Sequence, residues 1–216
     1  MESNTKKLLA ARFLFVGLLS TVVVLSGGGI LLRRPVGVAY IVLFILWMLS
    51  TVLGRPVGQS SIYNRSQRVI LVLGSLAIIP LVILAPWEYT HFSGPIPRDT
   101  VLAWFGLALF AAGICLQTAA MATLQGMYTL RLGVQRHRLI TTGAYRVVRH
   151  PGYLGNILEL FGIGLSLSSL FALATAFLVV PLLLLRIRDE EAMLKFEYPE
   201  YEDYTRHTKR LVPFIW

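Results

Sequence analysis

The chain has 216 residues, of which 56% are hydrophobic and only 14% charged, and its formal net charge is +9. Soluble globular domains usually carry about 25% charged residues, so the composition excludes an ordinary soluble domain and indicates a membrane protein. In a soluble protein this basic balance would suggest nucleic-acid binding. In a membrane protein, basic loops set the topology and contact anionic headgroups, so we expect no nucleic-acid partner.

Four apolar segments in the first half of the chain are each long enough to cross the bilayer as a helix. About 20 helical residues span about 30 Å of hydrocarbon, and no segment alternates with the period of two that a β-barrel requires. The predicted spans are residues 8–32, 36–54, 69–86 and 100–122. We therefore expect an all-α, polytopic helix bundle that forms one integral-membrane domain over residues 1–216, with residues 1–122 holding four transmembrane helices.

The positions of lysine and arginine predict the orientation of this bundle. With a cytoplasmic N-terminus, three basic residues fall in outside turns: Arg33, Arg34 and Arg98. Eleven fall in inside segments: Lys6, Lys7, Arg12, Arg55, Arg65, Arg68, Arg131, Arg136, Arg138, Arg146 and Arg149. Because cytoplasmic loops are enriched in basic residues, we expect a multi-pass protein whose N-terminus and whose segment 123–149 are cytoplasmic.

The apolar run at residues 155–185 has two readings. A single straight helix of this length would be about 46 Å long, well beyond the hydrocarbon thickness. The polar sequence SLSSL at 166–170 favours a break, which predicts a hairpin of two helices that need not cross the bilayer fully and that returns the chain to the side it left. The alternative is one tilted helix kinked at Pro181. Only the hairpin brings Arg149 and the charged C-terminal segment to the same face.

The segment after this run is highly charged. Residues 186–210 contain thirteen charged side chains, and the pairs Arg186/Glu190 and Glu191/Lys195 have helical i,i+4 spacing. Adjacent Glu190 and Glu191 project about 100° apart on a helix. We therefore expect one of them to pair within the protein while the other faces a ligand. The alternative is a surface helix with weak salt bridges.

The sequence RHP at 149–151 is also open to two readings when taken alone. Arg149 could be a topological arginine, and Pro151 could be the first residue of a helix. The His150 ring can stack, donate or accept a hydrogen bond, but a single border histidine is more often structural than catalytic.

Taken together, these residues resemble the isoprenylcysteine carboxyl methyltransferase and phospholipid methyltransferase superfamily of integral-membrane methyltransferases, over residues 124–214. The superfamily has the pattern G-x-Y-x-x-x-R-H-P-x-Y-x-G, followed after a hairpin by two glutamates. In this chain Glu197 stands where the family commonly has glycine. The matching positions are Gly143, Tyr145, Arg149, His150, Pro151, Tyr153, Gly155, Glu190 and Glu191.

The resemblance implies that residues 123–216 form a methyltransferase-like half with a small cytosolic pocket for S-adenosylmethionine, and that a lipid-like methyl acceptor enters from the bilayer. It implies catalytic roles for Arg149, His150 and Glu190, and a role for Arg188 in positioning the acceptor. The residues implied to bind the cofactor are Tyr145, His150, Pro151, Tyr153, Leu154, Gly155, Glu190 and Glu191.

Several alternatives remain open at this point. The acceptor could be the carboxylate of an isoprenylcysteine-like lipid, or a phospholipid amine or a thiol; a thiol or protonated amine would need a general base, for which His150 is the first candidate. Some sterol reductases that use NADPH resemble the same superfamily, and a scaffold that has lost its activity is a further alternative. No metal site is expected, because His91, His137, His207 and Cys115 have no metal-ligand spacing. The glycines at 17, 27–29, 106, 113, 162 and 164 are expected to permit close helix packing.

Overall fold

The computed structural model describes residues 2–54, 76, 80–92, 97–124 and 139–212. These residues form helices and turns together with one isolated bridge, between Val148 and Lys209. The predicted all-α class is confirmed. Four of the described helices are long and apolar enough to cross a membrane, so the chain is an integral-membrane helix bundle: Phe13–Arg33, Pro35–Val52, Val101–Leu124 and Leu170–Glu197.

The N-terminal half begins with two antiparallel helices, α1 (Glu2–Arg33) and α2 (Pro35–Gly54), which match the first two predicted spans within a few residues at their C-terminal ends. The third predicted span, 69–86, lies largely outside the described residues. Its described end is a π-helical turn, η1 (Pro80–Leu84), which continues as α4 (Ala85–His91). The predicted span ended at residue 86, but α4 continues to His91. Pro86 does not stop it, because Pro86 lies in the first turn of α4, where the N–H that proline lacks has no partner within the helix.

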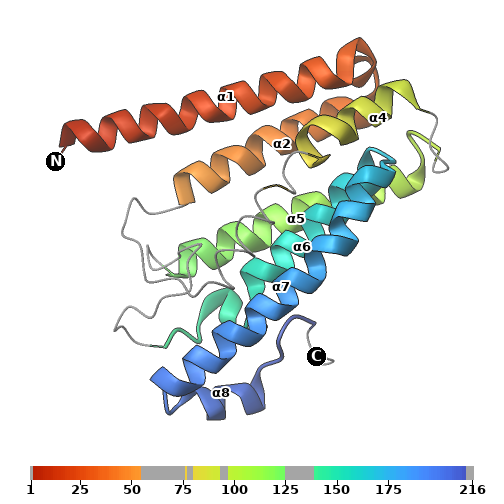
Figure 1. The fold of residues 1–216 in the computed structure, drawn as a ribbon. Helices are drawn as coiled ribbons and strands as arrows, with labels where there is room; N and C mark the ends of the chain where they lie inside the picture. The colour runs from red at the N-terminus through yellow and green to blue at the C-terminus, as the bar shows by residue number, and fades with distance from the viewer. Residues whose placement is uncertain (1, 55–75, 77–79, 93–96, 125–138, 213–216) are drawn as a thin grey trace.

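The C-terminal half is built on α5 (Val101–Leu124), α6 (Pro151–Ser166) and α7 (Leu170–Glu197). Figure 1 shows these three helices side by side, with α1 and α2 stacked on one flank. The last helix, α8 (Tyr201–His207), lies beneath the C-terminal end of α7. A short 3₁₀ turn, η2 (Gly143–Arg146), precedes α6.

The predicted hairpin at residues 155–185 is confirmed, and the single tilted helix is wrong. α6 ends at Ser166 and α7 begins at Leu170, so the chain reverses over three residues. Ser168 takes a left-handed conformation with φ of 51°, and the Ser169 hydroxyl caps α7 by accepting from the amide of Ala172. Pro181 lies within α7 without ending it. The 16 residues of α6 extend about 24 Å, less than the hydrocarbon thickness, whereas the 28 of α7 extend about 42 Å and carry its charged end beyond it.

A buried carboxylate holds the turn of this hairpin. Glu88 of α4 is only 6% exposed. Its Oε2 accepts hydrogen bonds from the Ser169 hydroxyl at 2.6 Å and from the Phe171 amide at 3.1 Å. Because the first amides of a helix carry partial positive charge, a carboxylate stabilises this end of α7. The first half of the chain thereby fixes the position of the hairpin.

Glycines allow α5 and α6 to pack with their backbones in close contact. A Cβ atom on Gly113 would lie 2.7 Å from the carbonyl oxygen of Gly155, and one on Gly162 would lie 2.5 Å from the amide nitrogen of Phe110. Gly106 and Gly164 are similarly crowded, so the packing role is confirmed at these four predicted positions. It is wrong for Gly17, Gly28 and Gly29, which have no neighbouring atom within 4 Å of an added Cβ, and an added Cβ on Gly27 would meet first the Leu31 side chain of its own helix.

Candidate functional site

The site begins where the chain returns to the bundle before α6. Gly143 has φ of 58°, a conformation that favours glycine. A Cβ there would meet the Thr123 side chain at the end of α5. Tyr145 follows in η2, and its carbonyl oxygen accepts a 2.5 Å hydrogen bond from the Tyr204 hydroxyl of α8. This segment is therefore attached both to α5 and to α8.

The sequence RHP forms the entry into α6. Pro151 is in the first turn of the helix, in agreement with one of the readings that the sequence left open, and His150 precedes it as the N-cap residue. His150 is only 3% exposed, and its ring meets the Tyr153 ring edge-on with the centroids 5.7 Å apart. The helix geometry thus buries His150 and directs Tyr153 toward α7.

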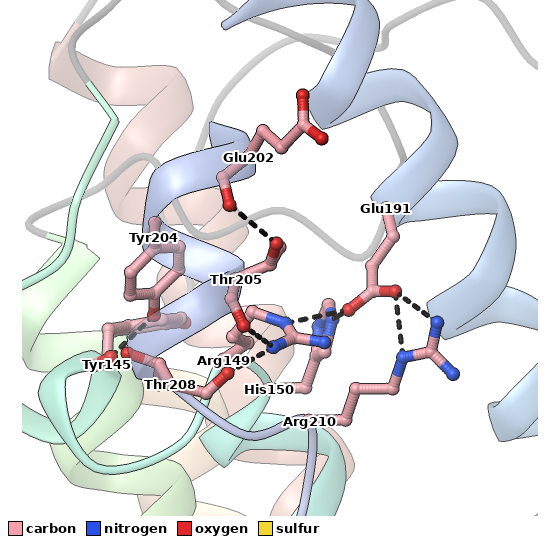
Figure 2. A network of polar contacts seen from close by, with 9 residues as sticks. All are labelled: Tyr145, Arg149, His150, Glu191, Glu202, Tyr204, Thr205, Thr208 and Arg210. Atoms are coloured by element: carbon pink, nitrogen blue, oxygen red, sulfur yellow. Dashed lines mark hydrogen bonds and ion pairs between the residues drawn. The ribbon is translucent and has the colours of Figure 1, made fainter. Parts of the chain in front are cut away.

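Glu191 of α7 is the centre of the most extensive ionic network among the described side chains (Figure 2). It is 4% exposed. Its Oε1 accepts from Arg149 Nε at 2.9 Å and lies 3.3 Å from His150 Nε2. Its Oε2 accepts a hydrogen bond from Arg210 Nε at 2.9 Å and lies 2.8 Å from Arg210 Nη2. One carboxylate therefore joins the start of α6, α7 and the C-terminal segment.

Arg149 extends this network to α8 and to the segment that follows it. Its Nη1 donates to the carbonyl oxygens of Thr205, at 3.3 Å, and Thr208. Its backbone amide donates to the Lys209 carbonyl at 2.8 Å, next to the Val148–Lys209 bridge. A buried arginine needs several acceptors to offset the loss of hydration. The contacts of Arg149 meet this need and dock the C-terminal segment against the entry to α6.

Glu190 takes part in a separate set of contacts. Its Oε2 accepts a 2.7 Å hydrogen bond from the Tyr153 hydroxyl, and the same hydroxyl accepts from Arg186 Nε at 2.8 Å. Arg186 is buried, whereas Glu190 is half-buried. The adjacent glutamates thus point to different partners, as their 100° separation on a helix predicts. Glu191 pairs with arginines of the protein. Glu190 contacts the Tyr153 hydroxyl, which also binds Arg186.

The structure brings together most of the residues predicted for the site. Arg149, His150, Tyr153, Glu190 and Glu191 converge from two segments about 40 residues apart in the sequence. The hairpin makes this possible, because it places the start of α6 beside the end of α7.

Three predicted residues lie differently from this group. Arg188 is exposed, and among the described residues it has no contact with the Glu190 or Glu191 networks. Gly155 faces α5, where a Cβ would lie 2.9 Å from the Gly113 carbonyl oxygen, so helix packing accounts for it. Leu154 is half-buried and donates its amide to the His150 carbonyl, an ordinary first-turn helix bond. Cofactor contacts of Gly155 and Leu154 stay predictions.

Sequence reasoning missed two arginines of the site. Arg186 was recognised only as an i,i+4 partner of Glu190, although it bonds to Tyr153. Arg210 lies in the charged C-terminal run, where no spacing rule connects it to Glu191, 19 residues earlier. The sequence offered only the basic pair Lys209 and Arg210 ahead of the apolar Leu211 and Val212, which does not specify a partner for Arg210.

The tyrosines of α8 show how enclosed this end of the molecule is. Burial raises the pKa of Tyr204 to about 12, and the positive charge of Arg149 opposes that rise. Burial also raises the pKa of Tyr201 well above its usual value. Both rings therefore stay protonated at neutral pH and pack edge-on, with centroids 5.9 Å apart. In the part of the chain that the structure describes, no three His, Cys, Asp or Glu residues are grouped as a metal site would require.

Comparison with known proteins connects this geometry to one family. The isoprenylcysteine carboxyl methyltransferase (ICMT) family matches residues 106–196, which cover most of α5 and nearly all of α6 and α7. The chain is 32% identical over 146 residues to protein-S-isoprenylcysteine O-methyltransferase B of Arabidopsis thaliana, covering 65% of this chain and 74% of that protein.

Two bacterial relatives are named for metal resistance. The chain is 33% identical over 117 residues to the nickel-cobalt-cadmium resistance protein NccN of Alcaligenes xylosoxydans xylosoxydans, covering 51% of this chain and 52% of NccN. It is 35% identical over 86 residues to the cobalt-zinc-cadmium resistance protein CzcN of Cupriavidus metallidurans, covering 38% of each. The chain thus spans about half the length of NccN.

The family follows from the first two comparisons. The region matched by the family contains α6, nearly all of α7 and both glutamates, and the alignment covers nearly three quarters of the plant enzyme. This chain therefore belongs to the isoprenylcysteine carboxyl methyltransferase family.

Proposed function

We propose that this chain is an S-adenosylmethionine-dependent methyltransferase that methylates the carboxylate of an isoprenylcysteine-like or other lipidic acceptor. The observation that carries the proposal is the Arg186–Tyr153–Glu190 chain of hydrogen bonds at the charged end of the α6–α7 hairpin. It combines a cation, a phenol and a carboxylate at the point where α7 leaves the hydrocarbon. Membership of a methyltransferase family supports it.

The donor set at Glu190 fits S-adenosylmethionine. Glu190 is half-buried, and its Oε2 accepts from Tyr153, while its Oε1 has no hydrogen bond to any described residue. An ionised carboxylate oxygen in this setting can accept from a ribose hydroxyl or an ammonium group, and such charge-assisted bonds are about twice as strong as neutral ones. We assign Glu190 and Tyr153 to the cofactor, with the His150 ring packed edge-on against the Tyr153 ring.

The arginines divide into two roles. Arg149 is engaged by Glu191 and by carbonyls of the C-terminal segment, so we assign it to holding the pocket closed. Arg186 lies beside Tyr153 on the helix that carries Glu190. In place of the exposed Arg188, we assign Arg186 to positioning the negative charge of the acceptor.

The chemistry needs alignment more than proton transfer. When bound, S-adenosylmethionine supplies a methyl carbon that bonds to a carboxylate oxygen of the acceptor while the carbon–sulfur bond breaks and its electron pair stays on sulfur. No proton moves in forming the methyl ester. The protein therefore contributes by orienting both partners in line and excluding water.

The burial of His150 favours a carboxylate over a thiol or an ammonium group. A general base must reach the proton that it removes. The His150 ring is 3% exposed, and its Nε2 lies beside Glu191 rather than at an open surface. An acceptor that requires no base fits this arrangement best.

A direct test uses the purified full chain in lipid nanodiscs. We expect it to bind S-adenosylmethionine and to transfer a tritiated methyl group to N-acetyl-S-farnesylcysteine. S-Farnesylcysteamine and farnesyl thiol serve as the matched amine and thiol acceptors, and we expect lower transfer to both. Binding of NADPH without binding of S-adenosylmethionine would refute the proposal in favour of a reductase.

We also propose that the pocket faces the cytoplasm, as the distribution of basic residues predicts. Val147 and residue 203 of α8 are exposed and both lie at the end of the bundle where α8 packs. In a Cys115→Ser background, Val147→Cys and Asp203→Cys should both react with an impermeant maleimide from the cytoplasmic side only. Labelling of both from the outside would reverse the orientation.

A further inference from the structure

A pair of amide side chains lies in the closely packed interface between α5 and α6, which also contains the buried Glu159. Gln117 of α5 is 4% exposed, and its Nε2 donates to Oδ1 of Asn156 in α6. Polar groups inside a membrane bundle are costly to bury, and they commonly mark a functional position.

The close glycine packing of the two helices brings this pair together. A Cβ on Gly155 would lie 3.0 Å from Cβ of Gln117 and 2.9 Å from the Gly113 carbonyl oxygen. The Cβ atom of Gln117 therefore lies directly against the backbone of α6. Asn156, the residue after Gly155, receives its hydrogen bond.

Stability alone does not account for this pair. The second amide atom of Gln117, Oε1, is buried and has no hydrogen-bond partner within the described residues. An unsatisfied buried carbonyl destabilises a protein, and two apolar side chains of similar shape would avoid that loss. The hydrogen bond that Gln117 does make has one clear effect: it fixes the orientation of the Asn156 amide.

The fixed orientation leaves a hydrogen-bond donor available. Asn156 Oδ1 is occupied by Gln117, whereas its Nδ2 bonds to no described residue. Asn156 is half-buried, so part of the residue is accessible from outside the bundle. An amide NH₂ group in this position can donate to a carboxylate oxygen.

Asn156 also lies at a depth in the bilayer that suits contact with a lipidic acceptor. It follows Tyr153 by three residues on α6, so the two share a neighbouring stretch of the helix and are separated by a rise of about 4.5 Å. Tyr153 bonds to Glu190 and Arg186 at the charged end of the hairpin. Asn156 is therefore on the bilayer side of that group, where a lipid tail would enter. Glu159, one turn further, is buried against Gly113 and faces α5.

We propose that Asn156 is an acceptor-binding residue that donates from Nδ2 to the carboxylate of the methyl acceptor, and that Gln117 is the positioning residue that orients it. The inference rests on the proposed function, because it takes the acceptor to be a lipidic carboxylate. It adds a specificity element to Arg186: a neutral donor that favours an anionic oxygen over an ammonium group.

The test compares two ligands that differ only at the carboxylate. Full-chain protein in nanodiscs is titrated with tritiated N-acetyl-S-farnesylcysteine and with its methyl ester, in a binding assay that needs no turnover. We expect Asn156→Leu to weaken binding of the acid about tenfold and Asn156→Asp to weaken it further by charge repulsion. Binding of the ester and of S-adenosylmethionine should change less than twofold. Gln117→Leu should give a smaller, acid-selective loss.

The control is Thr118→Ala, next to Gln117 but on the exposed face of α5, which should leave all three affinities unchanged. Equal loss for acid and ester, or no loss for either, would overturn the assignment of Asn156. No effect of Gln117→Leu beside a clear effect of Asn156→Leu would overturn the positioning role. Acid-selective binding without methyl transfer to any acceptor would refute the proposed function and leave the subsite standing.

Discussion

A buried glutamate lies at each end of the α6–α7 hairpin, Glu88 of α4 at the turn and Glu191 of α7 at the open end, and the two have different partners. At the turn, Glu88 accepts from a hydroxyl and a backbone amide, both neutral groups at a helix start. At the open end, Glu191 is surrounded by Arg149, Arg210 and the His150 ring. Both glutamates are buried, so burial alone does not identify a functional carboxylate. The partners of each carboxylate show which segments it holds together.

The difference lies in what each glutamate connects. Glu88 joins the N-terminal helices to the turn, and its loss should loosen that turn. Glu191 joins three segments that are far apart in sequence, so its loss should open the candidate pocket. Glu190, beside it, belongs to neither structural group and is the residue that we assign to the cofactor.

The largest effect is expected from Glu191→Ala. Removing one partner of a buried ionic network leaves the remaining charges without compensation, which destabilises a protein by about 3–5 kcal/mol. The Arg210 side chain is 38% exposed, and solvent screens its charge, so we expect the loss at the lower end, about 3 kcal/mol. Thermal unfolding in detergent measures it, together with loss of S-adenosylmethionine binding. Glu202→Ala on the exposed face of α8 is the control, and equal stability of both variants would contradict the network's role.

Glu88→Ala should have a smaller effect that is confined to stability. It removes the oxygen that accepts from the Ser169 hydroxyl and the Phe171 amide, and at about 1 kcal/mol net for each hydrogen bond the loss should be about 2 kcal/mol. The melting temperature should fall while the affinity for S-adenosylmethionine stays the same in the folded protein. Loss of affinity without a lower melting temperature would show that the two ends of the hairpin do not differ as described.

Glu190→Gln should do the reverse. The amide keeps the shape and can still accept from Tyr153, so the melting temperature should hardly change. Affinity for S-adenosylmethionine should fall about tenfold, because a hydrogen bond to a charged group contributes about 1.5–3 kcal/mol. Isothermal titration checks this, with Asp189→Asn as the neighbouring control. Unchanged affinity would remove Glu190 from the cofactor site.

The smallest effect is expected from Tyr204→Phe, which removes the hydrogen bond to the Tyr145 carbonyl and about 1 kcal/mol of stability. The pKa of Tyr204 is raised to about 12, above an unfolded value near 10. The protonated tyrosine therefore stabilises the fold fully below about pH 10, and this contribution is lost as the pH rises toward 12. Denaturant unfolding at pH 8 and pH 11 should show the two proteins converging; a constant difference would contradict the burial of this hydroxyl.

Much of the fold was predictable because long apolar segments have few alternatives in a bilayer. The helices at 36–54 and 100–122 and the break at 166–170 follow from segment length and from polar residues that hydrocarbon does not tolerate. The divergence of Glu190 and Glu191 was also predictable from helical geometry. The partners of each were not, because Arg210 reaches Glu191 only through the path of α8 and the C-terminal segment.

The sequence by itself determined the class of the protein, its hairpin and the set of residues that meet at the charged end, since these depend on composition, periodicity and a motif with fixed spacing. Only the tertiary structure decided their roles. It assigned Arg149 and Glu191 to holding the C-terminal segment, connected Arg186 with Tyr153 and Glu190, and placed Gln117 against Asn156. These assignments arise from contacts between segments that are far apart in the sequence, and no local rule along one helix specifies the side chain that faces it from another.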